Sequence, residues 1–207
     1  MKTKRKVDRR VARTRQMLKD ALISLISEKE FAAISITDII NRSDLNRSTF
    51  YAHFCDKEEL LACIINELIE GMMKSMQESP SITDPCQNGY ARPTHATIQL
   101  FTYVAEHAHY YKTMLNNQRV PQLAQRLSDT LYKFYLKEIE NHPDREDPLN
   151  LNKGFFACYL TSAVIGFIYH WVVITDLKYS PEFIAKELTK IFTMKPYIPY
   201  LQPSTSC

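Results

Sequence analysis

The sequence predicts an all-α protein. Its 207 residues include only four glycines, and no stretch alternates apolar and polar residues as a half-buried strand does. Apolar residues recur instead at the three- and four-residue spacing of an amphipathic helix, and several of these runs begin at a residue that caps helices well. We expect an N-terminal three-helix domain over residues 1–60, joined by one long helix to a larger helical domain over residues 61–207.

The first helix is predicted over residues 7–27, where apolar side chains share helical spacing: Val11, Leu18, Leu22, Leu25 and Ile26. The segment 2–15, which includes the chain ahead of this helix, holds eight Lys and Arg residues and one acid, Asp8. Such a run is either a solvated basic tail or a contact to phosphates and the minor groove of a nucleic acid. We favour the contact, because a helix-turn-helix pattern follows.

Residues 35–60 predict two short helices, a tight turn between them and the start of a longer helix. Ser35 and Asp38 have the spacing of a capping box, so a helix begins directly after Ser35. Asp44 falls in the turn, and aspartate is one of the few residues besides glycine that tolerate a left-handed backbone. Asn46 can cap the second short helix. The order helix, turn, helix over this distance is that of a helix-turn-helix.

The second short helix has two faces of different chemistry. Phe50 and Phe54 share one face and are predicted to point inward. The outward face carries short or forked hydrogen-bonding groups and almost no negative charge: Arg47, Ser48, Thr49, Tyr51 and His53. A helix with this outer face suits the major groove of double-stranded DNA. Asp56 then caps the longer helix, which Lys57 opens.

Residues 10–65 resemble the DNA-binding domain of TetR-family regulators. The runs T-D-I-I, L-N-R-S-T-F-Y-A-H-F and D-K-E-E-L-L carry the resemblance, with Asp44 standing where the family usually has glycine. Aspartate can occupy the left-handed region, so we expect only a small strain there. The resemblance implies a regulator that binds a palindromic operator as a dimer. It also implies that Arg47 and Ser48 reach base edges. Thr49, Tyr51, His53 and Lys57 are implied to face DNA as well, the last three mainly at phosphates.

Positive charge is concentrated in the first domain. Residues 1–57 hold 13 Lys and Arg residues against 7 Asp and Glu, whereas the rest of the chain holds 13 against 16. A phosphate-binding module has such an excess of cations. The five cysteines form no C-x-x-C pair, and the N-terminus lacks the apolar run of a secretion signal. We therefore expect reduced thiols and a cytoplasmic protein.

The long helix that joins the domains is predicted over residues 57–76, and prolines with one glycine predict a loop over residues 77–94. Two stretches that follow, LFTYVAEHAHYYKTML and GFIYHWV, resemble the C-terminal part of TetR regulators similar to activators of dihydroxyacetone-kinase operons. This resemblance implies control by a small-molecule effector or by a partner protein. Five helices are predicted in this domain, over residues 94–106, 109–117, 121–140, 149–175 and 181–193.

Residues 154–175 contain no Asp, Glu, Lys or Arg, and this length is sufficient to span a bilayer. Against a membrane-spanning role, the segment includes Tyr159, Thr161, Ser162 and His170, and a histidine is costly in hydrocarbon. The alternative is a helix that packs on one face against its own domain and on another against a second subunit. We expect this alternative, with a homodimer formed through residues 149–175 and 181–193 and no membrane association.

The second domain is rich in aromatic side chains, most of which are expected in its core, and its tyrosine phenols and His107 also suit an apolar pocket with a few polar groups. The residues predicted to bind a ligand are Phe101, Tyr103, His107, Tyr111, Phe134 and Tyr159. The histidines lack the spacing of a metal site, and no nucleophile elbow, phosphate-binding glycine loop or metalloprotease helix occurs. We expect no metal, no cofactor and no catalytic residue.

Two classes of function remain open on the sequence. The first is a sequence-specific DNA-binding regulator, in the first instance a repressor and alternatively an activator. The second is a helical ligand-binding, lipid-binding or membrane-associated protein, or an enzyme, in which the helix-turn-helix is incidental. Salt-dependent binding to a two-fold symmetric duplex separates the two classes.

Overall fold

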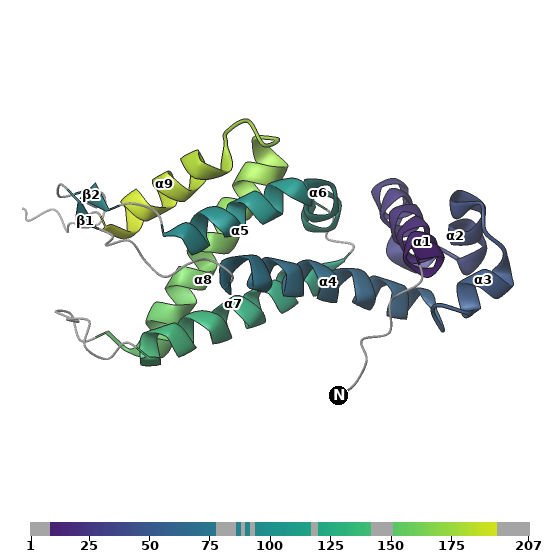
Figure 1. The fold of residues 1–207 in the computed structure, drawn as a ribbon, viewed down its shortest axis with the longest axis horizontal. Coiled ribbons are helices and arrows are strands. Elements are labelled where there is room, and N and C mark those ends of the chain that lie inside the picture. The colour runs from purple at the N-terminus through teal and green to yellow at the C-terminus, as the bar shows by residue number, and fades with distance from the viewer. Residues whose placement is uncertain are drawn as a thin grey trace, which may run out of the picture.

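The protein is elongated in the computed structural model, with two groups of helices joined by one long helix (Figure 1). The structure describes residues 9–77, 86–87, 90–91, 94–116, 120–141 and 151–193. Within these ranges the elements are helical apart from one pair of two-residue strands, which confirms the all-α fold class. Residues 1–8 of the predicted arm and most of the predicted loop over residues 77–94 lie outside the described residues.

The N-terminal group consists of a long first helix and two short helices that pack against it. Its elements are α1 (Arg9–Glu28), the 3₁₀ helix η1 (Phe31–Ala33), α2 (Ile36–Ser43) and α3 (Arg47–Tyr51). The apolar face of α1 is buried from Leu18 onward, as its helical spacing predicts, whereas Val11 near the start of the helix is exposed. Its buried apolar residues are Leu18, Ala21, Leu22, Ile23, Leu25 and Ile26.

Local hydrogen bonds fix the ends of α2 and α3 as the sequence predicts. Ser35 and Asp38 form a complete capping box, with the Asp38 amide donating to Ser35 Oγ at 3.1 Å and the Ser35 amide donating to Asp38 Oδ2 at 2.8 Å. Asp44 ends α2 in the left-handed region, with φ 53° and ψ 39°. Asn46 caps α3 by accepting the Thr49 amide at 2.8 Å. The turn geometry therefore follows from residues within the turn itself.

Helix α4 (Lys57–Gln77) leaves the N-terminal group and runs into the second group, where it packs along α5 (Figure 1). It passes without interruption through the boundary predicted at residue 60, so the division into two domains stays a prediction. The other helices of the second group are α5 (His95–Glu106), α6 (Ala108–Asn116), α7 (Pro121–Asn141), α8 (Lys153–Tyr169) and α9 (Pro181–Thr193), and the strands β1 (Cys86–Gln87) and β2 (Tyr90–Ala91) pair antiparallel.

Helix α8 differs from the predicted helix over residues 149–175 at both ends. Asn152 caps it by accepting the amides of Gly154 and Phe155, so the helix begins at Lys153. At its other end the backbone widens into a π-helical turn, η2 (His170–Ile174), in which the Thr175 amide donates to the His170 carbonyl at 2.9 Å. These changes are local and leave the predicted order of helices intact.

One face of α8 is buried in the second group and another is exposed. Ala157, Thr161, Val164 and Ile168 are buried, whereas Phe155 is 80% exposed. By length and composition alone, the stretch Lys153–Ile174 could cross a membrane. Among the described residues this is the one helical stretch with that property. The core helix of a soluble protein has the same composition, because its apolar side chains are needed inside the fold.

Candidate nucleic-acid interface

Helix α3 stands at the end of the molecule opposite to α9 (Figure 1). Arg47, Ser48 and Tyr51 are exposed, and Thr49 and His53 are half-buried. These are the five residues that the sequence predicts to face DNA from this helix and from the turn after it. The structure thus brings them together on one short segment, while their contact with DNA stays a prediction.

Two phenylalanines and an arginine support α3 from behind. Phe50 and Phe54 are almost fully buried, as predicted, and their ring centroids are 6.2 Å apart. The guanidinium carbon of Arg15, on α1, lies 4.5 Å from the centroid of the Phe54 ring. Burial of two aromatic side chains stabilises a five-residue helix that would not persist in isolation.

The outward side chains of α3 make short-range contacts with one another. The Asn46 Oδ1 atom accepts hydrogen bonds from the hydroxyls of Ser48 and Thr49, both at 2.7 Å, in addition to the Thr49 amide. The guanidinium of Arg47 lies 5.6 Å from the centre of the Tyr51 ring and donates to its hydroxyl at 3.4 Å. The Arg47 contact is long and exposed, so this side chain is able to turn toward a ligand at little cost.

Ion pairs hold α2 against the end of α1, and so fix the base on which α3 rests. Arg42 donates two parallel hydrogen bonds to Glu28, both at 2.8 Å. Lys29 pairs with Asp38 at 2.9 Å. The hydrogen bond from Lys29, followed by those from Ser35, lowers the pKa of Asp38. Glu28 and Asp38 thus stay ionised, and each is paired with a cation at the contact between α1 and α2.

Lys57 has a different environment from the other predicted DNA contacts. Its Nζ atom donates to the carbonyl oxygens of Phe31 at 2.9 Å, Ala32 at 3.1 Å and Ile34 at 2.7 Å. The cap predicted at Asp56 is present, since its carboxylate accepts the Glu59 amide at 2.6 Å. Lys57 therefore opens α4 as predicted, but its ammonium lies against the connection between α1 and α2.

Polar contacts between the two groups of helices were not predicted from the sequence. The Tyr110 hydroxyl, on α6, donates to Asp20 of α1 at 2.6 Å, and Gln16 donates to that hydroxyl at 2.6 Å. Lys19 of α1 is only 8% exposed and forms an ion pair with Glu67 of α4. Lys19 lies at helical spacing from the buried Leu22, Ile23 and Ile26, and a lysine on this face of α1 is the sequence signal that points to the second contact.

These contacts hold their groups in defined protonation states. Burial and the hydrogen bond to Asp20 raise the pKa of Tyr110 well above its ordinary value, so the phenol remains a donor. Burial would also raise the pKa of Glu67, but hydrogen bonds from Lys19 and Cys63 outweigh it and lower that pKa. Glu67 therefore stays ionised beside Lys19.

The six residues predicted to bind a ligand are spread through the second group. Tyr103 stacks on His107 with ring centroids 4.1 Å apart, and its hydroxyl donates to the Glu67 carbonyl of α4 at 3.3 Å. This approach requires a glycine, because a Cβ atom on Gly71 would lie 2.0 Å from the Tyr103 hydroxyl. Phe101 and Tyr111 are fully buried, Phe134 is half-buried and Tyr159 is exposed.

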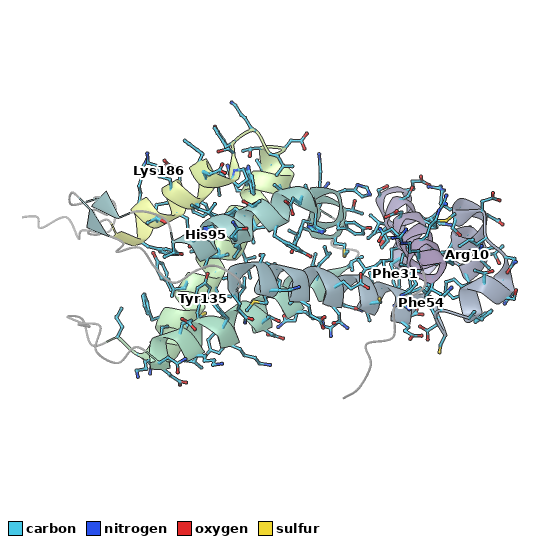
Figure 2. All side chains as sticks on the ribbon, viewed as in Figure 1. Arg10, Phe31, Phe54, His95, Tyr135 and Lys186 are labelled. Atoms are coloured by element: carbon cyan, nitrogen blue, oxygen red, sulfur yellow. The ribbon has the colours of Figure 1, made fainter. Side chains whose placement is uncertain are left out.

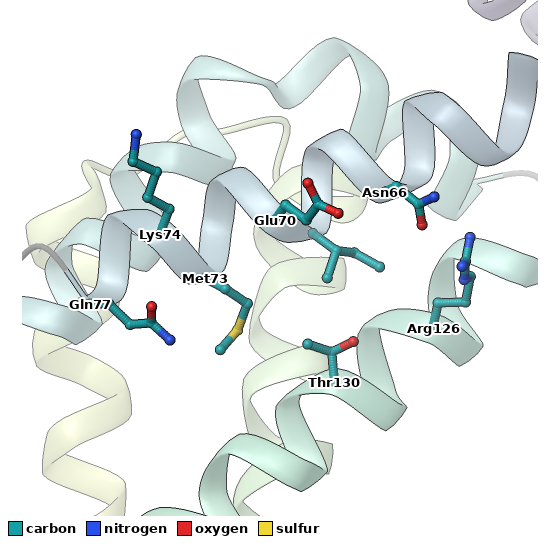
Figure 3. A pocket seen from close by; sticks show the side chains of 8 residues that line it. Asn66, Glu70, Met73, Lys74, Gln77, Arg126 and Thr130 are labelled. Carbon is teal, nitrogen blue, oxygen red and sulfur yellow. The ribbon is translucent and has the colours of Figure 1, made fainter. Parts of the chain in front are cut away.

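A cleft of about 400 Å³ lies between α4 and α7 (Figure 3). Ile69 and Met73 form its apolar part, and polar residues line it from both helices, among them Glu70 on α4 and Arg126 and Thr130 on α7. None of the six predicted ligand residues lines this cleft. Their role in ligand binding stays a prediction, and the cleft lining was missed because it depends on how α4 and α7 pack.

A second groove, of about 470 Å³, runs along α8, η2 and α9. Gly166, Trp171 and Phe183 are among the residues that line it. A Cβ atom on Gly166 would meet no other atom within 4 Å, so the groove is open there. Among the described residues, no cluster of three or more His, Cys, Asp or Glu side chains is arranged to hold a metal ion.

Comparison with known proteins places both parts of the chain among bacterial regulators. The family described as "Bacterial regulatory proteins, tetR family" matches residues 18–64. The family described as "Transcriptional regulator C-terminal region" matches residues 92–194. An uncharacterized HTH-type transcriptional regulator of Bacillus subtilis (strain 168), YxbF, is 26% identical over 195 residues, which are 93% of this chain and 48% of that protein. The chain thus spans about half the length of this relative.

Solved structures share the fold at low sequence identity. A protein from Syntrophomonas wolfei assigned to the TetR family has a TM-score of 0.68 at 20% identity, over 87% of this chain and 93% of that chain. A TetR transcriptional regulator from Streptococcus agalactiae 2603V has a TM-score of 0.63 at 20% identity, over 89% and 96%. The dihydroxyacetone kinase operon activator DhaS has a TM-score of 0.57 at 18% identity, over 86% and 93%. These values support a common fold.

Replacement of Arg47 by alanine is expected to relax sequence preference. An arginine that pairs with a guanine edge discriminates by about 1–3 kcal/mol, so the affinity for the preferred site should fall toward that for unrelated duplexes. Binding assays at one fixed salt concentration measure the ratio of the two affinities. Lys133→Ala, at an exposed position of α7, is the control and should leave the ratio unchanged. An unchanged ratio for Arg47→Ala would exclude a base contact by this residue.

Proposed function

The chain belongs to the TetR family of bacterial transcription regulators, and we propose that it binds a two-fold symmetric operator as a homodimer. The observation that carries this proposal is α3 itself, a short helix backed by Phe50 and Phe54 with Arg47, Ser48 and Tyr51 on its outer surface. The chain is a DNA-binding regulator and no catalytic role is proposed. We further propose that it acts in the cytoplasm as a repressor, with activation as the alternative sense of control.

The dimer is proposed to form through α8 and α9. Large apolar side chains lie exposed on these two helices and next to them, including Phe155 at 80%, Tyr159 at 51% and Ile174 at 58%. A monomer seldom leaves a large apolar patch in water, so a second subunit is the natural cover for this face. A single helix-turn-helix reads few base pairs, and two of them at a fixed spacing give useful specificity.

Control is proposed to act through α4 and the cleft between α4 and α7. This cleft has the size of a small-molecule site, an apolar part at Ile69 and Met73, and polar groups from both helices, such as Glu70 and Arg126. A ligand wedged there would alter the tilt of α4, which also belongs to the N-terminal group. The contacts of Tyr110 with Asp20 would transmit a movement of α6 directly to α1. A partner protein that docks on the second group is the alternative.

The Gly166→Glu variant tests the dimer and the operator together. The new side chain meets no atom of its own subunit near Cβ, so the monomer fold should persist while a charge enters the proposed interface. Light scattering at micromolar concentration is expected to give a dimer for the wild-type protein and a monomer for the variant. Footprinting of the promoter nearest its gene should show two protected half-sites with the wild-type protein and none with the variant. A wild-type protein that is a monomer and still binds the operator would contradict the proposal.

Filling the α4–α7 cleft tests the proposed effector site. Thermal-shift screening of metabolites should identify a ligand that raises the melting temperature and changes operator affinity. Thr130→Trp, which fills the cleft, should abolish both the thermal shift caused by that ligand and the change that the ligand causes in operator affinity. Lys133→Trp, an exposed position outside the cleft lining, is the matched control. If no ligand is found and a copurifying protein changes operator affinity, the small-molecule site is excluded and the partner-protein alternative remains.

A further inference from the structure

The ammonium of Lys57 is enclosed by the short connection between α1 and α2. All three of its hydrogen bonds go to backbone carbonyls, those of Phe31, Ala32 and Ile34, at 2.9, 3.1 and 2.7 Å. The same ammonium lies 4.8 Å from the centre of the Phe31 ring. Figure 2 shows Phe31, which belongs to the N-terminal group, beside α4. An ammonium has three donors and no more, so its hydrogen-bonding capacity is used within the protein.

These hydrogen bonds join the two ends of residues 34–57, the DNA-reading segment, which contains α2 and α3. The chain leaves η1 at Ile34, forms α2 and α3, and returns at Lys57. The bond from Lys57 to the Ile34 carbonyl therefore joins the two ends of the segment that contains both short helices. The ammonium also places a positive charge at the carbonyl end of η1, where the backbone dipoles favour a cation.

We propose that Lys57 is a positioning residue that sets the angle of α3 relative to α4, and that it makes no phosphate contact. The proposal rests on the operator binding proposed above. A phosphate contact would require Nζ to release at least one of its three carbonyl partners. With the ammonium in place, the loop from residue 34 to residue 57 keeps one orientation on α4, and the two α3 helices of a dimer keep one separation.

Lysine and arginine differ in a way that distinguishes the two roles. A guanidinium is planar and presents its donors as a fork that fits two phosphate oxygens, so it serves well at a phosphate contact. It does not match three carbonyls gathered around one point, which suits the compact ammonium. Lys57→Arg should thus preserve a phosphate contact and disrupt the positioning contact. Lys57→Met removes the charge and keeps the apolar stem against Phe31.

The test compares operator and non-specific duplexes across a salt series, at temperatures where each variant is folded. For Lys57→Met and for Lys57→Arg we expect operator affinity to fall about tenfold while non-specific affinity and the salt slope stay unchanged. A lost phosphate contact would instead reduce the slope of log K against log salt by about 0.9 for Lys57→Met, lower both affinities, and be restored by arginine. That result would overturn the proposal. An equal fall in both affinities at unchanged slope would also overturn it, because it indicates only lost stability.

A measurement on the wild-type protein keeps the proposal testable if the variants do not fold. The Lys57 ¹⁵Nζ resonance should be visible and protected from exchange in the free protein, and should not move when an operator duplex is added. A shift of that resonance on addition of the duplex would overturn the proposal. A wild-type protein that binds no duplex in a salt-dependent manner would instead refute the proposed function, and the resonance of the free protein would still report the carbonyl contacts.

Discussion

Helix α4 contributes side chains to both ends of the molecule. Leu60 and Leu61 are buried where it leaves the N-terminal group, whereas Met72 and Met76 are buried in the second group, where α4 packs along α5. Because one continuous helix belongs to both groups, neither can tilt without the other responding. The position of α3, and with it the spacing of two half-sites in a dimer, depends on this shared helix.

Polar contacts supplement the shared helix on the side of α1. Lys19 binds Glu67 on α4, and Tyr110 on α6 binds Asp20. An effector or partner that binds one orientation of α4 more tightly than another would shift the population of DNA-competent molecules. The contacts between the groups supply a physical route for this shift, because α6 and α4 both touch α1. Regulation of this kind requires no change in α3 itself.

The sequence predicts those features that arise from neighbouring residues. The capping box of Ser35 and Asp38, the left-handed turn at Asp44 and the inward Phe50 and Phe54 were all predicted, because each depends on spacing within a few residues. The surroundings of Lys57 were not predicted, since its partners lie more than twenty residues away. The α4–α7 cleft was missed because its lining comes from two helices that are distant in the sequence. The resemblance to a family did not show which residues of these helices face each other.

The central claim is that a dimer holds its two α3 helices at one separation through α4. Cys55 is exposed immediately after Phe54 and provides a labelling site beside the DNA-reading segment. With the other four cysteines replaced by serine, pulsed electron paramagnetic resonance measures the distance between spin labels on the two Cys55 residues of the dimer. We predict a distance distribution that narrows around a value on the order of 35 Å, one turn of the double helix, when operator duplex is added. The absence of any dipolar signal, or a broad distribution that operator DNA leaves unchanged, would contradict the claim.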